Sequence, residues 1–214
     1  MPGFIRARPI GMPPPHAPAA VPDLLDPIAE FQSLFARLPQ DAPTDPTAMA
    51  LATADASGAP SARMVLLKGV DERGFQFFTN YDSRKGRELA ENPRAALCWH
   101  WDWLEMQVRA EGTIERLPAA ESDAYFATRP RGHQLGAWAS FQSQPLVSRF
   151  ALLRRVVATE MLYLGRAVPR PPHWGGYLLR PHAIEFWQGK KSRLHERRHF
   201  HLEDGVWQCD RLSP

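Results

Sequence analysis

Residues 61–80 read SARMVLLKGVDERGFQFFTN, and their pattern decides the fold. Apolar residues recur with a period of two along Ser61–Val70 and again along Phe75–Asn80, which is typical of β-strands with one buried face. The residues between them, Asp71–Gly74, are typical of a tight turn. We therefore expect a β-hairpin over Ser61–Asn80, within a protein rich in antiparallel strands.

The strand pattern continues on both sides of this hairpin. Further strands are expected at Ala48–Asp55, Ala95–Trp101, Met106–Leu117, Gly176–Arg180, Ile184–Gln188, Arg193–Leu202 and Val206–Leu212. Turns are expected at Ser57-Gly58 and at Glu203–Gly205, and the second turn closes a hairpin. Roughly eight short strands with helices between them favour a closed antiparallel barrel with packed helices, an α+β fold.

Three helical regions are predicted from apolar spacing and from capping residues. The first begins at Asp26, an N-cap that is followed by Pro27, and ends at Leu38 before a proline. The other two are expected from Ser83 to the residues before Pro93, and over Ala119–Leu164 with breaks at Pro130 and Pro145.

Composition bounds the class of protein. The chain has 214 residues, and 26 Lys and Arg against 23 Asp and Glu leave a net charge of +3, which excludes a polybasic coat. The proline-rich residues 1–23 are expected to form a disordered arm ahead of one domain at 24–214. Two cysteines suit a reducing compartment, and no apolar run approaches the roughly 18 residues of a membrane span. We expect a cytoplasmic protein without a membrane partner.

The stretch Ser83-Arg84-Lys85 is a candidate anion site. Ser83 is a good N-cap, so Arg84 and Lys85 are expected in the first turn of a helix, where cations oppose the helix dipole. An anion held by the free backbone N–H groups reverses that penalty. The pattern fits an anion site, and it fits equally well two solvated side chains at a surface turn.

A second candidate is the cationic stretch that begins at Arg193. Residues two apart share a face of a strand, so Arg193, His195 and Arg197 are expected to point the same way. The row is either the solvated face of a hairpin or a cationic wall for a phosphate or carboxylate, with His195 able to exchange a proton. By the same rule, Arg63 and Lys68 are expected on opposite faces of their strand.

Two other classes of ligand are not expected. His195 and His199 have the four-residue spacing of metal ligands on a helix, but this stretch is predicted as a strand, so we expect no metal site. The seven tryptophans do not interleave with basic residues as they do in a nucleic-acid stacking platform, so we expect no nucleic-acid partner.

Arg129 stands at a predicted helix end, where the helix dipole alone explains an arginine.

Taken together, these stretches resemble the pyridoxine/pyridoxamine 5′-phosphate oxidase family. The matching segments are RMVLLKG (63–69), FFTNYDSRKGREL (77–89), EMQVRAEG (105–112), YFATRPRGHQLGAWASFQS (125–143), PPHWGGY (171–177), IEFWQG (184–189), RLHER (193–197) and the terminal RLSP. The resemblance runs from about Asp26 to Pro214. It implies an FMN-binding split β-barrel that works as a homodimer, with the flavin in the cleft between the subunits.

The family oxidises pyridoxine or pyridoxamine 5′-phosphate to pyridoxal 5′-phosphate, and O2 reoxidises the flavin and gives H2O2. The resemblance implies a flavin shell made of Arg63, Met64, Val65, Leu66, Leu67, Lys68, Phe78, Thr79, Arg84, Lys85, Gln107, Gln142, Ser143, Trp187 and Arg197. It implies substrate contacts from Lys68, Tyr125, Arg129, His133, Arg193, Leu194 and His195. By this resemblance Arg193 and His195 are the catalytic residues. Arg193 polarises the reacting group, and His195 orients the ring or assists proton movement.

The sequence departs from the family pattern at three positions. His133 stands where the family usually has serine, Phe78 replaces a tyrosine, and Met106 replaces an arginine. An imidazolium also binds phosphate, and none of the three changes removes a flavin contact. Two alternatives are a flavin oxidase of the phenazine-biosynthesis type and a non-catalytic flavin- or haem-binding protein on the same barrel. The retained Lys68, Tyr125 and Arg129 argue against the phenazine type, because by the resemblance these residues bind the substrate phosphate.

Overall fold

The computed structural model describes residues 26–39 and 41–214, so the predicted arm at 1–23 lies outside the described residues. The helices are α1 (Pro27–Phe35), α2 (Arg84–Glu91), α3 (Ala119–Thr128), α4 (Arg131–Ala139) and α5 (Arg149–Leu162), with short 3₁₀ turns η1 (Asp102–Leu104) and η2 (Lys191–Arg193). The strands are β1 (Ala48–Ala54), β2 (Pro60–Leu66), β3 (Gly69–Asp71), β4 (Gly74–Asn80), β5 (Arg94–Trp101), β6 (Met106–Arg116), β7 (Trp174–Gln188), β8 (Glu196–Glu203) and β9 (Val206–Arg211). None of the helices in these ranges is long and apolar enough to cross a membrane.

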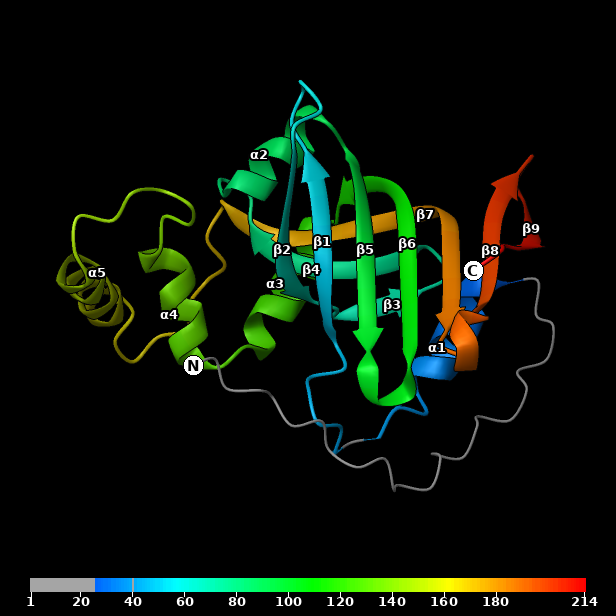
Figure 1. Cartoon of the computed structure of the whole chain (residues 1–214). Coiled ribbons are helices and arrows are strands. Elements are labelled where there is room, and N and C mark those ends of the chain that lie inside the picture. The colour runs from blue at the N-terminus through cyan, green and yellow to red at the C-terminus, as the bar shows by residue number, and fades with distance from the viewer. Residues whose placement is uncertain (1–25, 40) are drawn as a thin grey trace, which may run out of the picture.

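The strands of the described chain form one antiparallel sheet that curls into a split barrel (Figure 1). The main path runs β2-β1-β5-β6-β7-β4-β3, and β8 and β9 branch from β7. Only Leu67 and Lys68 join β2 to β3, although these strands stand at opposite ends of the path. So short a link spans about 11 Å at most, which forces the two ends of the sheet toward each other. Because β2 and β3 do not pair within the described residues, the barrel is split and not closed.

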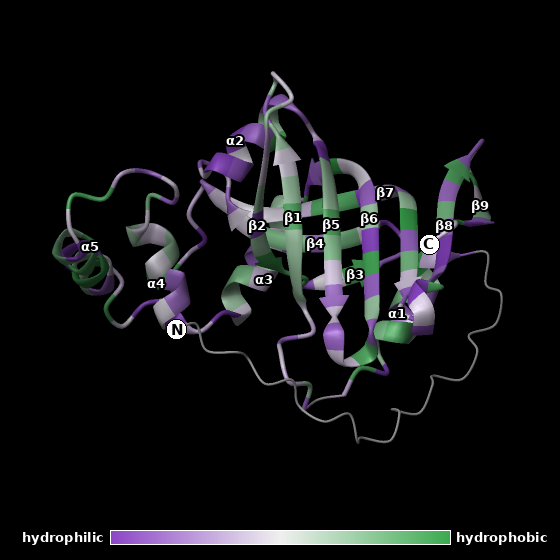
Figure 2. Ribbon diagram, viewed as in Figure 1, coloured by the Kyte–Doolittle hydropathy of each residue, from purple (hydrophilic) through white to green (hydrophobic). Residues whose placement is uncertain are grey.

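The inner face of the sheet forms the main hydrophobic core, and α1 packs onto it. Phe31 of α1 is fully buried, with its ring centroid 4.9 Å from that of Phe75 and 4.8 Å from that of Trp99. Asp26 caps this helix as predicted, because its carboxylate accepts the backbone N–H of Ile28. Hydrophilic and hydrophobic residues alternate along β6 (Figure 2), so the period of two marks one buried face as expected.

A smaller core joins the helical region to the sheet. Its buried members are Phe126 of α3, Leu135 of α4, Trp174 of β7, and Val168 in the segment between α5 and β7. α5 packs against α4 and lies beyond it, away from the barrel (Figure 1). The predicted helical stretch is therefore three helices, and the predicted breaks at Pro130 and Pro145 fall in the two loops between them.

The predicted hairpin over Ser61–Asn80 is wrong in its first half. β2 ends at Leu66 and pairs along its whole length with β1, where Leu51 lies opposite Arg63. Within Ser61–Asn80, only β3 and β4 pair as a hairpin, and the turn between them is the predicted one at Asp71–Gly74. The apolar pattern continues through Leu67, so periodicity alone does not reveal that the chain leaves one partner strand for another at that point.

Two predictions near the C-terminus are also wrong. The strands expected at Gly176–Arg180 and Ile184–Gln188 are one long strand, β7, although a proline lies between them. A register shift between Glu111 and Gly112 of β6 accommodates this irregularity. The strand expected from Arg193 begins only at Glu196, because Arg193 belongs to η2 and has a positive φ of 63°.

Candidate active site

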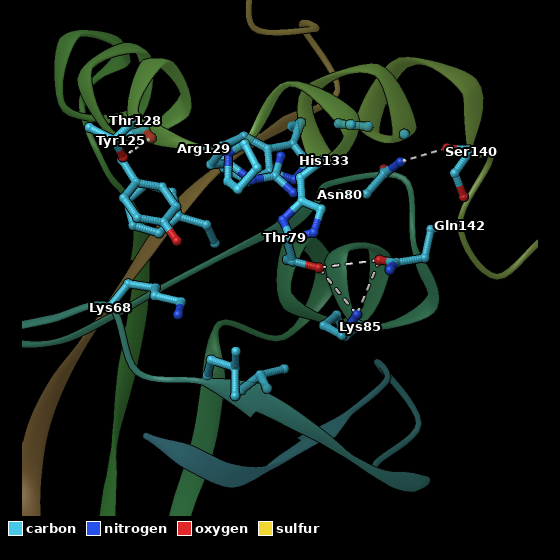
Figure 3. Close-up of a pocket in the computed structure, with 18 of the residues that line it drawn as sticks. Lys68, Thr79, Asn80, Lys85, Tyr125, Thr128, Arg129, His133, Ser140 and Gln142 are labelled. Atoms are coloured by element: carbon cyan, nitrogen blue, oxygen red, sulfur yellow. Dashed lines mark hydrogen bonds between the residues drawn. The ribbon is translucent and has the colours of Figure 1, made fainter. Parts of the chain in front are cut away.

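Two adjoining cavities open between the sheet edge and the helical region. The larger has a volume of about 750 Å³ and lies between β2, β4, α3 and α4 (Figure 3). The smaller has a volume of about 400 Å³ and lies at the start of α2. Met64, Lys85 and Gln142 line both cavities, so the two are neighbours.

The start of α2 forms one wall of the smaller cavity. Ser83 caps the helix by accepting the backbone N–H of Gly86. A Cβ at Gly86 would lie only 2.0 Å from the carbonyl oxygen of Tyr81, so glycine permits the preceding turn to fold onto the helix. Arg84 and Lys85 therefore occupy the first turn as predicted, beside the positive end of the helix dipole.

Glu88 of α2 forms ion pairs with two arginines that line the smaller cavity. Its carboxylate forms ion pairs with Arg63 at 3.2 Å and with Arg84 at 2.8 Å, and it accepts hydrogen bonds from the hydroxyls of Ser61 and Thr53. Burial raises the pKa of Glu88, but these hydrogen bonds outweigh burial and lower the pKa to about 2. Glu88 is thus ionised at neutral pH and fixes the two guanidinium groups beside the cavity.

Lys85 has no acidic partner of its own within the described chain. Its side chain is buried, and its ammonium donates to the Thr79 hydroxyl at 3.2 Å and to Gln142 Oε1 at 3.3 Å (Figure 3). Burial and the nearby charge of Arg63 lower the pKa of Lys85 to about 8. Three cations and one carboxylate leave an excess of positive charge at the helix start, which a bound anion would neutralise.

The far end of the larger cavity holds a second group of cations. The Arg129 guanidinium lies over the Trp174 ring at 4.5 Å, and its Nη1 is buried without a hydrogen-bond partner in the described chain. Burial lowers the pKa of Arg129, as expected for a cation withdrawn from water. Lys68 and His133 point into the same space (Figure 3). A buried unpaired guanidinium is costly, so it indicates a site for a second anion.

An aromatic stack supports this end of the cavity. Tyr125 stacks on Phe78 with ring centroids 3.9 Å apart, and it lies nearly parallel to Trp174. Burial raises the pKa of the Tyr125 hydroxyl, which remains a hydrogen-bond donor at neutral pH. The stack fixes Tyr125 between Lys68 and Arg129, where its hydroxyl can reach a ligand of both (Figure 3).

The remaining predicted residues lie elsewhere in the chain, beyond both cavities. Gln107, Trp187 and Arg197 are cross-strand neighbours on β6, β7 and β8, so they form a row. Arg197 is held there by Glu185, at 2.8 Å. This group lies at the end of the sheet opposite α4 and α5 (Figure 1). Within one chain the candidates therefore form two separate groups.

His195 lies beside that row, and both His195 and Arg193 precede the first residue of β8. The His195 ring packs on Trp187 at 4.7 Å, and its Nδ1 accepts the backbone N–H of Lys190. Arg193 is exposed in η2 and has no hydrogen bond or ion pair with the described residues. The prediction that Arg193, His195 and Arg197 share one strand face is wrong for Arg193 and for His195, because β8 starts only at Glu196.

Each predicted residue can now be placed. Met64, Val65, Leu66, Lys68, Phe78, Thr79, Lys85, Tyr125, Arg129, His133 and Gln142 line the larger cavity. Arg63, Arg84 and Ser143 line only the smaller cavity. Leu67 packs in the main core, and Gln107, Trp187, Arg193, Leu194, His195 and Arg197 line neither cavity. Their roles stay predictions.

The sequence analysis missed Glu88 and Trp174. The spacing of Arg84 and Glu88 is that of an ion pair on a helix, which is a usable signal. The other partners of Glu88, Thr53 and Ser61, come from strands far away in the sequence, so its burial was not foreseeable.

The substitution Glu88→Gln is expected to destabilise the ligand-free protein. A carboxyl whose pKa falls from 4.5 to about 2 on folding contributes about 3 kcal/mol at neutral pH. Because the folded-state pKa is lowered, this contribution is present above pH 4.5 and is lost as the pH falls toward 2. Urea unfolding at pH 7 and pH 3 measures both values.

Glu91→Gln is the matched control, because Glu91 is exposed on the same helix. It is expected to change the free energy of unfolding by less than about 0.5 kcal/mol. An equal loss at both pH values in Glu88→Gln would contradict the electrostatic explanation.

Comparisons with known proteins identify the family of this chain. The family described as "Pyridoxamine 5'-phosphate oxidase" matches residues 40–163, and the "Pyridoxine 5'-phosphate oxidase C-terminal dimerisation region" matches residues 174–214. A pyridoxine/pyridoxamine 5′-phosphate oxidase of Rubrobacter xylanophilus is 56% identical over 88% of this chain and 87% of its own. The protein of that name from Anaeromyxobacter dehalogenans is 54% identical over 94% of this chain and 100% of its own.

Solved structures show the same fold. PhzG from Burkholderia lata 383, in complex with tetrahydrophenazine-1-carboxylic acid, has a TM-score of 0.86 and 33% identity over 92% of this chain and 99% of its own. A pyridoxamine 5′-phosphate oxidase-related, FMN binding protein from Nostoc punctiforme has a TM-score of 0.69 at 17% identity, over 87% of this chain and 96% of its own. Because the family descriptions and the curated relatives agree over most of its length, the chain belongs to the pyridoxine/pyridoxamine 5′-phosphate oxidase family.

Proposed function

We propose that this protein is an FMN-dependent oxidase that converts pyridoxine or pyridoxamine 5′-phosphate to pyridoxal 5′-phosphate. The observation that carries the proposal is a pair of neighbouring cavities that share three lining residues, each with its own group of cations. One group, at the start of α2, suits the phosphate of the cofactor. The other, around Arg129, suits the phosphate of the substrate. A cofactor and a substrate that each carry one phosphate match the two groups.

The residues of the smaller cavity fit FMN. Arg63, Arg84 and Lys85 would hold its phosphate, since their charge exceeds that of Glu88. β2 stands at the end of the sheet path. The outward backbone groups of Met64–Leu66 therefore have no partner strand within the described chain, and they could form hydrogen bonds with the polar edge of the flavin. When bound, the flavin supplies the hydride acceptor and passes electrons to O2, which gives H2O2.

The protein's own part is to bind and orient the substrate. Lys68, Tyr125, Arg129 and His133 would grip the phosphate by charge-assisted hydrogen bonds. Arg193 then polarises the reacting alcohol or amine. Nδ1 of His195 accepts the backbone N–H of Lys190, so in the neutral imidazole the proton is on Nε2. This Nε2–H can donate to the substrate or orient the substrate's pyridine ring.

A second copy of the chain must complete such a site. The residues predicted at Trp187, Arg193, His195 and Arg197 line neither cavity of their own chain. In a homodimer with the flavin between the subunits, the second copy brings them to the cavity. Met64 on edge strand β2 is 64% exposed, which suits a surface that a partner covers. The match to a dimerisation region over residues 174–214 supports this arrangement.

FMN affinity is expected to fall as the pH rises above about 8. Lys85 has a lowered pKa of about 8, so its charge is present below that pH and is lost above it. A phosphate is already a dianion from about pH 7, so its own charge does not change in this range. A charge-assisted hydrogen bond contributes about 1.5–3 kcal/mol, and loss of one proton from a group of pKa about 8 limits the fall by pH 9.5 to about 30-fold, so we expect a fall of about 10- to 30-fold. Fluorescence titration of FMN between pH 7 and pH 9.5 measures it.

Lys85→Met provides the control for that titration. It is expected to bind FMN more weakly at pH 7 and to lose the dependence on pH. A wild-type profile that is retained in Lys85→Met would show that another group titrates.

Steady-state turnover tests the proposed function. With FMN added, pyridoxine 5′-phosphate is expected to yield one H2O2 and one aldehyde per turnover, and unphosphorylated pyridoxine is expected to react far more slowly. Yellow, FMN-loaded protein that produces no aldehyde from either phosphorylated substrate would contradict the proposal. That outcome would favour the phenazine-type oxidase or a non-catalytic flavoprotein.

A further inference from the structure

A cluster of metal-ligating side chains lies outside the two cavities, on the hairpin of β8 and β9. His199 and His201 of β8 and Asp210 of β9 each offer one ligand atom, and these atoms lie within 4.8 Å of one another. His201 Nδ1 is 3.5 Å from Asp210 Oδ2. The two imidazole rings lie nearly parallel with centroids 5.8 Å apart.

Strand geometry explains why these residues meet. His199 and His201 are two apart on β8, so both side chains leave the same face of the sheet. Phe200, between them, points the other way into the main core. The register places Asp210 directly opposite His199, and directly opposite residues share a face. Both histidines are half-buried, which shields them partly from water.

Nothing else in the described chain engages the ligand atoms of this cluster. His199 makes no hydrogen bond there, and the only polar contact of His201 and Asp210 is the one between them. At 3.5 Å that contact is longer than an ordinary hydrogen bond. Two imidazole nitrogens and one carboxylate oxygen are therefore free to bind a common ligand.

We propose that His199, His201 and Asp210 form a binding site for a divalent transition metal ion of the zinc class. Imidazole nitrogen with carboxylate oxygen is a donor set that Zn²⁺ and Co²⁺ accept in four-coordinate sites. Metal–nitrogen bonds of about 2.0–2.1 Å require the three groups to close by small side-chain rotations. Water, or Gln208 opposite His201 on the same face, takes the fourth position.

Such an ion would link β9, the last strand, to β8. Among the described strands β9 pairs with β8 alone, so it is the outermost of them at the C-terminal end (Figure 1). Asp210 comes from β9 and the histidines from β8, so one ion bonds to both strands. We expected no metal site after weighing His195 and His199, with His201 and Cys209 beyond them in the sequence, and Asp210 was not considered.

Titration of the full-length, FMN-loaded protein with Co²⁺ after treatment with a chelator tests the proposal. We expect one Co²⁺ per chain and visible absorption typical of tetrahedral Co²⁺ at wavelengths beyond the flavin bands. His199→Gln and His201→Gln are each expected to weaken binding roughly 100-fold or more, since even outer-shell changes cost 10- to 100-fold. Excess Zn²⁺ is expected to displace Co²⁺.

His182→Gln is the matched control, because His182 is exposed and lies outside the cluster. It is expected to bind Co²⁺ as the wild type does. Absence of a stoichiometric spectral change would overturn the proposal, as would a double variant His199→Gln/His201→Gln with unchanged affinity. Repeating the titration on FMN-free protein is expected to give the same stoichiometry, so the result does not depend on the proposed oxidase function.

Discussion

Arg129→Ala is expected to lower kcat/KM for pyridoxine 5′-phosphate by roughly 100- to 1,000-fold, or about 3–4 kcal/mol, which is the lower part of the range lost when one partner of a buried ion pair is removed. Nη1 of Arg129 is buried and has no partner in the described chain, so the phosphate would be its partner. The loss should appear mainly as a higher KM, because Arg129 would bind the substrate phosphate, which is far from the reacting carbon. FMN should remain bound, since Arg129 does not line the smaller cavity.

The stability of the same variant provides a second readout. The unpaired guanidinium costs free energy in the ligand-free protein, and its contact with Trp174 returns only part of that cost. The melting temperature of Arg129→Ala is therefore not expected to fall. Arg154→Ala, at an exposed position on α5, should leave both kcat/KM and the melting temperature unchanged. A large loss of stability with unchanged KM would show that Arg129 is structural.

At substrate concentrations far below the KM of Arg129→Ala, mixed dimers of Arg129→Ala and Arg193→Ala chains are expected to recover activity that both parent dimers lack. If each site takes Arg129 from one chain and Arg193 from the other, a mixed dimer holds one intact site and one doubly altered site. Its activity should be about half that of the wild-type dimer. Chains with different affinity tags, co-expressed and purified through both tags, supply the mixed species for a turnover assay.

The control for this experiment is a mixed dimer of two differently tagged Arg129→Ala chains, which should stay inactive. A mixed dimer of Arg129→Ala and Arg193→Ala that is also inactive would mean that both residues serve the cavity of the same chain. That result would contradict the placement of Arg193 at the partner's site, and it would leave the Arg129 prediction standing.

Local sequence patterns predict most of the fold. The alternation along β6, the Asp26 cap of α1 and the breaks around α4 follow from rules that act over a few residues. The errors arise where a distant partner decides the outcome. At Leu67 the chain changes its partner strand, and the apolar pattern continues through the change.

The candidate site shows the same division. The cations at the start of α2 follow from a helix cap, and the structure places Lys85 at a cavity as that reasoning suggested. Glu88 was missed because two strands that are remote in the sequence bury it. Arg193 was assigned to a strand, but η2 and a positive φ set it outside β8. Only tertiary structure separates the group around Lys85 from the row at Trp187.

Anaerobic mixing of FMN-loaded protein with pyridoxine 5′-phosphate tests the central claim most directly. One equivalent of substrate per flavin is expected to bleach the visible flavin absorbance and to yield one equivalent of pyridoxal 5′-phosphate, and admission of air should restore the colour. Flavin that stays oxidised with both pyridoxine and pyridoxamine 5′-phosphate would contradict the claim that this cavity joins a flavin to a vitamin B6 phosphate.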